Sequence, residues 1–472
     1  MKHAVNVVFR CIFTCLLVVF SCDAVFGQLL PPPVTQFPVF ESRTDSIAYA
    51  ILDAKLVNRA EQALNMKVLD SVQTARRTFL ETHRFVWRTN YRQDRSFTPY
   101  QSLKTIANKD SITRISIVGH GRKQLPDSIY MYKNLMELEL IDFRLSRLPR
   151  KLVKQSQFKK INLYNNFTEK KLRLARSASV TALNIRGDEK GKLPKSYKAF
   201  KNLEVLNLSR NNLKEFPNTH GCKKLKHLSL VGNAIDISKR PAKFSTSITK
   251  LDLGLNGLTF VPSWIGDFVK LQSLNLNNNN IEKIEPGIER IAGLQELSLY
   301  KNNLREIPPM LYTMSSLKVI DLYYNRIARL EPDVANWKDL EILYLANNEI
   351  YSLPEEIGQL TRLRELYLHH NKLSNLPVSV GDLKDLGILR INNNNIVEWP
   401  IGLLRLKMLS NFDASFNQFE SLPVSELDFS HMKVLSLGGN PWTPDMRKTI
   451  KLWADALREN DIVVHLGDGK NP

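Results

Sequence analysis

The hydrophobic and polar positions between Ile112 and Trp442 recur with a fixed period. The pattern L-x-x-L-x-L-x-x-N-x-L occurs fifteen times, and successive copies begin 22 or 23 residues apart. The L-x-L core predicts a short strand with alternate residues inward. One such unit cannot bury its apolar face alone, so neighbouring units must stack into a solenoid. The first apolar positions are Ile112, Leu135, Phe158, Val180, Leu203, Leu225, Ile248, Leu271, Leu294, Leu317, Leu340, Leu363, Leu386, Leu409 and Met432.

The ninth position of the pattern is asparagine in twelve of the fifteen copies. An inward asparagine can satisfy backbone groups at the turn after the strand, where no ladder partner exists. We therefore interpret these asparagines as structural and not as catalytic. They are Asn166, Asn211, Asn233, Asn256, Asn279, Asn302, Asn325, Asn348, Asn371, Asn394, Asn417 and Asn440. The three exceptions all lie early in the array: His120, Phe143 and Asp188.

Ten copies continue with an apolar residue and proline, as in Leu353-Pro354 and Leu376-Pro377. Because proline removes a donor and disfavours helix just before it, the return limb should be extended or short 3₁₀, with at most a brief helix. Trp399 and Phe216 replace the leucine of this motif, and we expect both in the core.

The repeat resembles that of the leucine-rich-repeat superfamily. The phrase L-P-x-x-I-G-x-L at residues 353–360 is similar to the short-repeat class of Ras-suppressor-type and plant intracellular Ras-group-related proteins and their bacterial homologues. This resemblance implies an α/β solenoid shaped as a horseshoe, with a concave parallel sheet and usually a protein ligand. The chain lacks the cysteine-rich caps of animal and plant extracellular members, which favours a bacterial secreted protein.

The two ends of the array have cap-like sequences. Residues 100–111 predict a short N-terminal cap helix before the repeats at 112–442. Residues 443–472 predict a C-terminal cap, with Thr443 as N-cap and Pro444 at the first helical position. The apolar residues of this helix share one face: Met446, Ile450, Trp453 and Leu457.

The segment before the repeats predicts export. Residues 1–27 read as a signal peptide, with an apolar run of ten from Cys11 to Phe20 that is too short to span a membrane as a mature helix. Val25 and Gly27 suit a cut before Gln28, whereas a lipoprotein anchored at Cys22 is the alternative. Residues 28–44 read as a proline-containing linker, and residues 45–99 as a helical region that serves as a cap or as a docking element.

Positive charge is concentrated in the first half of the repeats. The formal net charge of the chain is +19, with +14 between residues 101 and 200 and +7 between residues 201 and 250, whereas residues 251–350 carry −4. An anionic glycan or envelope surface is therefore an alternative partner for residues 101–250, beside the simpler reading of a solvated basic face. Nucleic acid is not expected, because no nucleic-acid-binding module accompanies the charge.

Residues that could carry catalysis are sparse. The chain has no P-loop, no G-x-S-x-G and no H-E-x-x-H motif. Cys222, which alone would remain after signal removal, lies beside lysines that could lower its pKa, although a structural thiol is the simpler reading. His369-His370 has no third ligand at metal-binding spacing. We expect no enzyme activity, no cofactor and no metal.

The repeat phase identifies the residues that point out of the concave sheet, at the third, fifth and seventh positions. Most are small or polar, but five consecutive repeats from Leu294 onward carry large aromatic or basic residues there. Tyrosine and arginine are enriched at interface hot spots. The alternative is that the tyrosines only stack to stabilise the sheet. The predicted partner-binding residues are Tyr300, Tyr323, Tyr324, Tyr344, Tyr367, His369 and Arg390.

The sequence thus predicts a non-enzymatic, extracytoplasmic protein-binding scaffold. The alternative is a carbohydrate or anionic envelope-surface binder. No segment after the signal is long and apolar enough to span a membrane.

Overall fold

The computed structural model describes residues 35–40, 85–90, 98–100, 109–166, 170–187, 193–195, 197–427 and 431–466. The chain divides into two units, one of residues 1–107 with 114–118 and one of residues 108–113 with 119–472. Each is described by itself. Among the described residues, no helix has the length and apolar character needed to cross a bilayer.

In the first unit, β1 (Thr35–Phe40) pairs antiparallel with β2 (Phe85–Asn90), and β3 (Thr98–Pro99) pairs parallel with β4 (Arg114–Val118). β1 lies in the segment expected to be a linker, at 28–44, and β2 in the region expected to be helical, at 45–99; most of both segments lies outside the described residues, so their expected boundaries stay predictions. Both strands are rich in aromatic and β-branched residue types, which favour strands. The expected signal peptide and most of the expected N-terminal cap helix lie outside the described residues.

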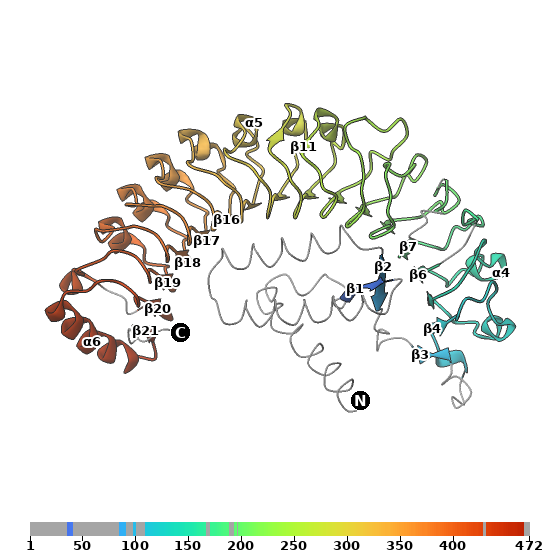
Figure 1. Ribbon diagram of the computed structural model, residues 1–472, viewed down its shortest axis with the longest axis horizontal. Helices are drawn as coiled ribbons and strands as arrows, with labels where there is room; N and C mark the ends of the chain where they lie inside the picture. Colours follow the sequence, from blue (N-terminus) through green and yellow to red (C-terminus); the bar gives the residue numbers. More distant parts are fainter. Residues whose placement is uncertain are drawn as a thin grey trace. The chain divides into compact units, whose positions relative to one another are not determined.

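The second unit is a leucine-rich-repeat solenoid. Each repeat contributes one short strand, and each strand pairs in parallel with the next along the concave side (Figure 1). The strands are β5 (Glu137–Ile141), β6 (Lys160–Tyr164), β7 (Ala182–Arg186), β8 (Val205–Asn207), β9 (His227–Ser229), β10 (Lys250–Asp252), β12 (Ser273–Asn275), β14 (Glu296–Ser298), β15 (Val319–Asp321), β16 (Ile342–Tyr344), β17 (Glu365–Tyr367), β18 (Ile388–Arg390), β19 (Asn411–Asp413), β20 (Val434–Ser436) and β21 (Val463–His465).

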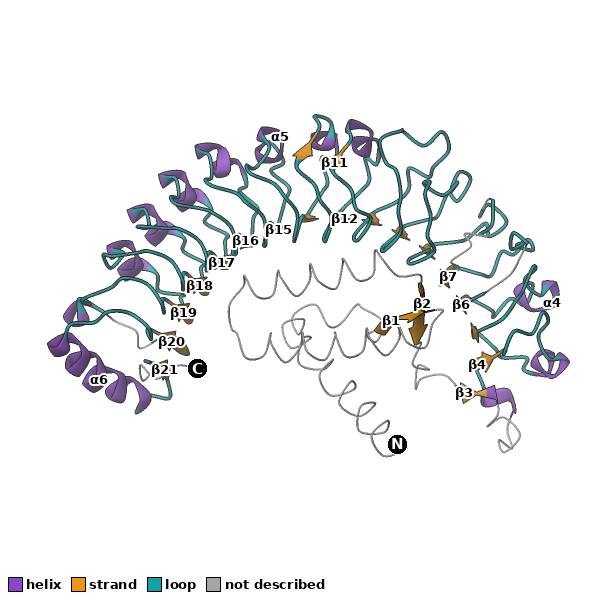
Figure 2. Ribbon diagram, viewed as in Figure 1, coloured by secondary structure: helices purple, strands orange, loops and turns teal. Residues whose placement is uncertain are grey.

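Most return limbs, on the opposite side of the solenoid, contain a short helix, drawn in purple in Figure 2, whereas none of the described residues between 165 and 259 is helical. Most of these helices are 3₁₀ turns of three to five residues, and the two α-helices among them have four residues each, which confirms the proline-based prediction. They are η2 (Lys109–Ser111), η3 (Asp127–Met131), α4 (Arg150–Val153), η4 (Ser263–Asp267), η5 (Ile288–Arg290), α5 (Pro309–Tyr312), η6 (Pro332–Asn336), η7 (Glu355–Gln359), η8 (Val378–Asp382), η9 (Ile401–Arg405) and η10 (Val424–Glu426). β11 (Phe260–Val261) and β13 (Lys283–Ile284) pair in parallel on the same side.

The core is built by the motif leucines. In the repeat that begins at Leu363, the four motif residues Leu363, Leu366, Leu368 and Leu373 are fully buried. Trp399 is also buried, as predicted. Phe216 is half-buried and packs against Phe268, with ring centroids 6.0 Å apart.

The motif asparagines bond the backbone of two repeats at once, which confirms their predicted structural role. Asn325 is representative. Its Nδ2 donates to the carbonyl of Leu322 in its own repeat and to that of Leu299 in the preceding repeat, both at 3.0 Å. Its Oδ1 accepts from the N–H of Leu304 at 3.1 Å. Each asparagine therefore fastens its repeat to the one before.

The residue before the ninth motif position has left-handed backbone in every repeat from Asp142 to Gly439. Asparagine and glycine tolerate this conformation, but a bulky side chain there is unusual and carries a steric cost. Tyr324, His370 and Phe416 occupy this position with φ of 55°, 53° and 53°.

The array ends in α6 (Pro444–Arg458) and β21. The hydroxyl oxygen of Thr443 accepts from the N–H of Met446 at 3.3 Å, so Thr443 caps the helix. Ile450, Ala454 and Leu457 of α6 are buried, and β21 pairs with β20.

Candidate functional site

Six of the seven predicted site residues occupy two parallel rows on the concave face, and Tyr324 follows Tyr323 at the eighth motif position. The fifth-position row runs through neighbouring strands, with Tyr344 opposite Tyr367 and Tyr367 opposite Arg390 in the register of the sheet. Tyr300, Tyr323 and His369 form the seventh-position row, two residues further along each chain segment. All seven predicted side chains are half-buried. We name them the tyrosine patch: Tyr300, Tyr323, Tyr324, Tyr344, Tyr367, His369 and Arg390.

Ring contacts join six of the seven residues of the tyrosine patch. Tyr300 stacks on Tyr323 with centroids 5.9 Å apart, and Tyr324 meets Tyr323 edge-on at 4.7 Å. Tyr344 stacks on Tyr367 at 4.8 Å. His369 links the two groups, since its ring lies 5.5 Å from that of Tyr323 and 6.3 Å from that of Tyr367.

Polar contacts hold these rings in place. The Tyr323 hydroxyl and the Nε2 of His369 share a hydrogen bond of 3.0 Å, and the Tyr367 hydroxyl donates to Glu365 at 2.8 Å. Burial, with help from the positive charge of Arg390, lowers the pKa of His369 to about 4, so the imidazole is neutral at pH 7. Burial raises the pKa of Tyr344 to about 12. The patch therefore presents neutral aromatic groups.

Arg390 stands apart from the ring contacts. Within the described residues its guanidinium has no ion pair, and its shielded Nε has no hydrogen-bond partner. Its neighbour in the register on the other side is Asp413.

The sequence reasoning did not single out the carboxylates that lie among the tyrosines. Asp321 is the fifth-position residue next to Tyr344, and its carboxylate accepts from the Ser298 hydroxyl and from the N–H of Tyr323, both at 3.1 Å. Burial raises the pKa of Asp321 to about 6. Glu296 and Glu365 occupy third positions. The repeat phase that identified the tyrosines would have found these residues as well.

Cys222 and the histidine pair show no sign of chemistry. Cys222 is fully buried, and burial raises the pKa of its thiol to about 11, which contradicts the lowered pKa that its lysine neighbours suggested. Because the thiolate is the reactive form, this thiol is structural. The described part of the chain contains no group of three or more His, Cys, Asp or Glu side chains suited to a metal.

Family models of leucine-rich repeats match several parts of the chain. The model described as leucine rich repeat matches residues 315–373 and 338–396, and further leucine-rich-repeat models match residues 201–240 and 270–291. The chain is 30% identical over 154 residues to leucine-rich repeats and immunoglobulin-like domains protein 3 of Homo sapiens, which is 31% of this chain and 14% of that protein. It is 29% identical over 161 residues to leucine-rich repeat serine/threonine-protein kinase 1 of Mus musculus, which is 32% of this chain and 8% of that protein. The chain thus spans only a small part of these relatives.

Solved structures share the fold over most of the chain. A leucine-rich-repeat protein of Leptospira interrogans is 26% identical with a TM-score of 0.61, covering 78% of this chain and 100% of that one. The leucine-rich-repeat ectodomain of the plant receptor kinase GASSHO1/SCHENGEN3 from Arabidopsis thaliana, in complex with Casparian strip integrity factor 2, is 24% identical with a TM-score of 0.52, covering 75% of this chain and 41% of that one. The repeat pattern and the family models show that the chain contains leucine-rich repeats, and the solved structures share its solenoid fold.

Proposed function

We propose that the chain is a non-enzymatic, extracytoplasmic scaffold that binds a protein through the tyrosine patch. Repeat solenoids use extended concave surfaces for binding. The observation that carries the proposal is the gathering of five tyrosines, a histidine and an arginine on one part of that surface. Such side chains combine large contact area with a polar tip and dominate binding energy at interfaces.

The extracytoplasmic location rests on the sequence of residues 1–27. We propose removal of this segment after Gly27, in a bacterial secreted homologue of the short-repeat class. Intact mass and N-terminal sequencing of the protein from its source cells test this. A mature chain that begins at a lipid-modified Cys22 would contradict it.

The test of the patch is a double variant, Tyr323→Ala with Tyr367→Ala, in the full chain. Both side chains point away from the core, so the repeats should remain folded. Truncating an interface hot spot costs about 2 kcal/mol or more, so the two changes together should weaken binding at least about 100-fold. Proteins that wild type retains from a source-cell extract and the variant loses would be identified by mass spectrometry and titrated individually.

A thermal melt separates binding from stability. The stacked ring pairs contribute about 0.5–1.5 kcal/mol each, so a modest fall in Tm is expected. A variant that melts earlier but binds the titrated protein normally would show that the rings only stabilise the sheet.

A second candidate function has a specific observation of its own. A hollow of about 820 Å³ on the return-limb side is lined, among the described residues, by five basic side chains and no acidic one. Such a hollow suits an anionic glycan or envelope surface. The basic residues are Arg147, Lys170, Lys171, Arg173 and Lys195.

Charge reversal distinguishes this candidate from the first. If the chain binds through the hollow, Lys170→Glu with Lys171→Glu should weaken binding strongly, and the tyrosine changes should have little effect. If it binds through the tyrosine patch, the charge reversals should change mainly the salt dependence of association. Titrations of both variants at two salt concentrations give the answer.

A further inference from the structure

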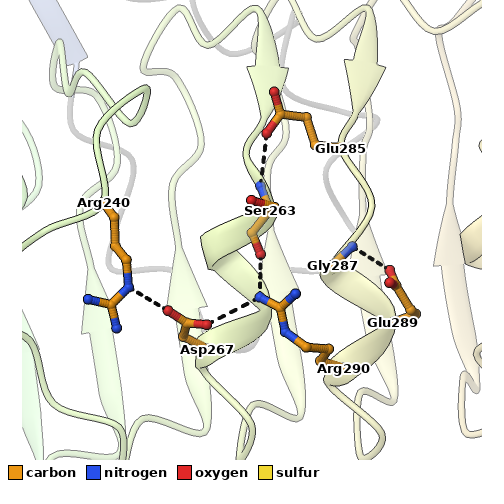
Figure 3. A network of polar contacts seen from close by, with 7 residues as sticks. All are labelled: Arg240, Ser263, Asp267, Glu285, Gly287, Glu289 and Arg290. Carbon is orange, nitrogen blue, oxygen red and sulfur yellow. Dashed lines mark hydrogen bonds and ion pairs between the residues drawn. The ribbon is translucent and has the colours of Figure 1, made fainter.

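Several acidic residues on the return-limb side and in the loops form ion pairs with basic ones. Asp267 bonds Arg240 at 2.6 Å and Arg290 at 3.2 Å, as Figure 3 shows. Asp382 bonds Arg405 at 3.0 Å, and the same pairing recurs at other repeats. Further pairs are Arg362 with Asp339 and Lys372 with Glu349. Other carboxylates of this side accept from backbone N–H groups, as Glu285 does from Ser263 and Glu289 from Gly287.

Four carboxylates point from the strands of the concave sheet beside the tyrosine patch, and within the described residues none of them has an ion pair. Their hydrogen bonds come from neutral donors, such as the Tyr367 hydroxyl to Glu365 and the Ser415 hydroxyl to Asp413 at 2.6 Å. We name these the concave carboxylates: Glu296, Asp321, Glu365 and Asp413.

One basic side chain stands among the concave carboxylates. At the third, fifth and seventh positions from Glu296 to Gly438, Arg390 is the only lysine or arginine. The outward groups of these repeats therefore carry a formal charge of −3 at neutral pH, on a chain whose total is +19. This local sign is opposite to that of the whole molecule.

The tyrosine rings and the concave carboxylates favour the same kind of ligand. The face of an aromatic ring is negative and attracts a lysine or arginine side chain. An uncompensated carboxylate attracts the same groups and bonds arginine with two oxygens. We propose that the concave face from Glu296 to Asp413 binds a segment of a protein partner that is rich in arginine or lysine. This inference rests on the proposed function and specifies the chemistry of its partner.

The spacing of the strands suggests how such a segment lies. Asp321 and Glu365 belong to β15 and β17, with β16 between them. Two strand spacings amount to about 9.5 Å, and three residues of a polyproline II segment span about 9.3 Å. An extended segment that crosses the strands with a basic residue at every third position would place one cation on each of Asp321, Glu365 and Asp413, which follow one another at two-strand intervals. Arg390 would then face a neutral or acidic residue of the partner.

A blocked synthetic peptide of four Arg-Pro-Pro triplets tests the proposal with the full chain. Titration calorimetry at about 50 mM salt should show binding that weakens strongly at about 500 mM, since exposed charges are then screened. Asp321→Asn with Glu365→Gln should weaken binding at least about tenfold, whereas Arg390→Gln should strengthen it about threefold by removing a repulsive charge. A peptide with citrulline in place of arginine should bind at least about tenfold more weakly.

The matched control neutralises two paired carboxylates on the other side of the solenoid. Asp339→Asn with Asp382→Asn removes the same charge as the test variant, so the affinity should stay within about twofold of wild type. Equal losses in the two double variants would overturn the proposal. So would equal binding of the citrulline peptide, or no binding of the arginine peptide at all.

The outcomes also separate this proposal from the proposed function. If a captured protein depends on Tyr323 and Tyr367 but the arginine peptide does not bind, the protein-binding site stands and the basic segment is wrong. If the peptide binds through Asp321 and Glu365 and no protein depends on the tyrosines, cation recognition stands alone. Sedimentation of the chain at low salt identifies the case in which the basic segment comes from a second copy, because self-association would then be lost in the same double variant.

Discussion

At the scale of single residues, the fifth position of the repeat accepts both amides and carboxylates. The side chains of Asn207 and Asn275 accept from the N–H two residues on, each at 2.9 Å. Asp321 makes the same bond to Tyr323 at 3.1 Å. The amides and the carboxylate make the same hydrogen bond, but only the carboxylate can carry a charge. Burial disfavours that charge and raises the pKa of Asp321 to about 6. In the native state this carboxyl holds its proton more tightly than in the unfolded chain.

We predict that Asp321→Asn stabilises the protein at pH 7.5 by about 1–2 kcal/mol, because an amide keeps the hydrogen bond without a buried charge. A folded-state pKa above the unfolded value contributes stability at low pH that is lost as pH rises through 6. The difference in the free energy of unfolding between Asp321→Asn and wild type should therefore become smaller as the pH falls from 7 to 4. Chemical denaturation at several pH values measures it.

The reciprocal change gives the control. Asn275→Asp should destabilise the chain by a similar amount at pH 7.5 and by little at pH 4, since it introduces a comparable buried carboxylate. A difference between variant and wild type that does not change with pH would contradict this account.

For single residues, the sequence predicts which side chains point out of the concave sheet better than it predicts their hydrogen bonds and burial. The repeat phase identifies Tyr323, Tyr367 and Asp321 as outward-pointing residues. It does not reveal that His369 bonds Tyr323 or that Asp321 is shielded, because these depend on side-chain rotamers and on how closely adjacent repeats approach. A charged residue at an outward position is expected to be exposed to water. That Asp321 is shielded becomes clear only from the side chains packed around it in the structure.

At the scale of elements, the Ile-Gly phrase of the return limb has a steric explanation. The 3₁₀ turns η8 and η9 lie side by side, with the backbone of Gly381 against that of Gly402. A β-carbon on Gly381 would overlap the carbonyl oxygen of Gly402, and Gly266 meets Gly287 in the same manner. Glycine at this position lets consecutive turns pack closely.

We therefore predict that Gly381→Ala destabilises the protein by about 1–3 kcal/mol, the usual cost of overpacking. The neighbouring atom is backbone, which cannot rotate away. Gly293→Ala is the matched control, because nothing lies within 4 Å of a β-carbon there. It should be neutral or stabilising by up to about 1 kcal/mol. Thermal melts of the two variants compare them, and equal stabilities would contradict the steric explanation.

Elements inside the repeats were predictable because proline, glycine and leucine recur at fixed positions. The strands and the short 3₁₀ return limbs follow from that recurrence. Outside the repeats this constraint is missing. The region expected to be helical at residues 45–99 contains the strand Phe85–Asn90, since a short apolar run fits helix and strand alike.

At the scale of the whole molecule, every interior repeat is covered by two neighbours, whereas the last one needs α6 and β21. Leu435 and Leu437 of that repeat are fully buried. The indole N–H of Trp442 donates to the carbonyl of Leu437 at 3.3 Å, and Val464 of β21 lies opposite Leu435 in the sheet.

Truncation at residue 440 should therefore cost several kcal/mol and promote association. Each large side chain returned to water contributes about 1.5–3 kcal/mol, and an uncovered terminal repeat tends to aggregate. Sedimentation and thermal melting test this, with a truncation at residue 466 as the control that keeps α6 and β21. A truncated chain that stays monomeric and melts at the wild-type temperature would refute the capping role.

The hydrogen bonds of the motif asparagines between successive repeats have a mechanical consequence. Because each asparagine fastens its repeat only to the one before, a pulling force at the two ends of the solenoid would act on one junction at a time. Each released repeat of 23 residues would lengthen the chain by about 76–83 Å at full extension. The solenoid should therefore unfold under tension one repeat at a time, in steps of nearly equal length. A partner held on the concave face across several junctions would oppose the first of them.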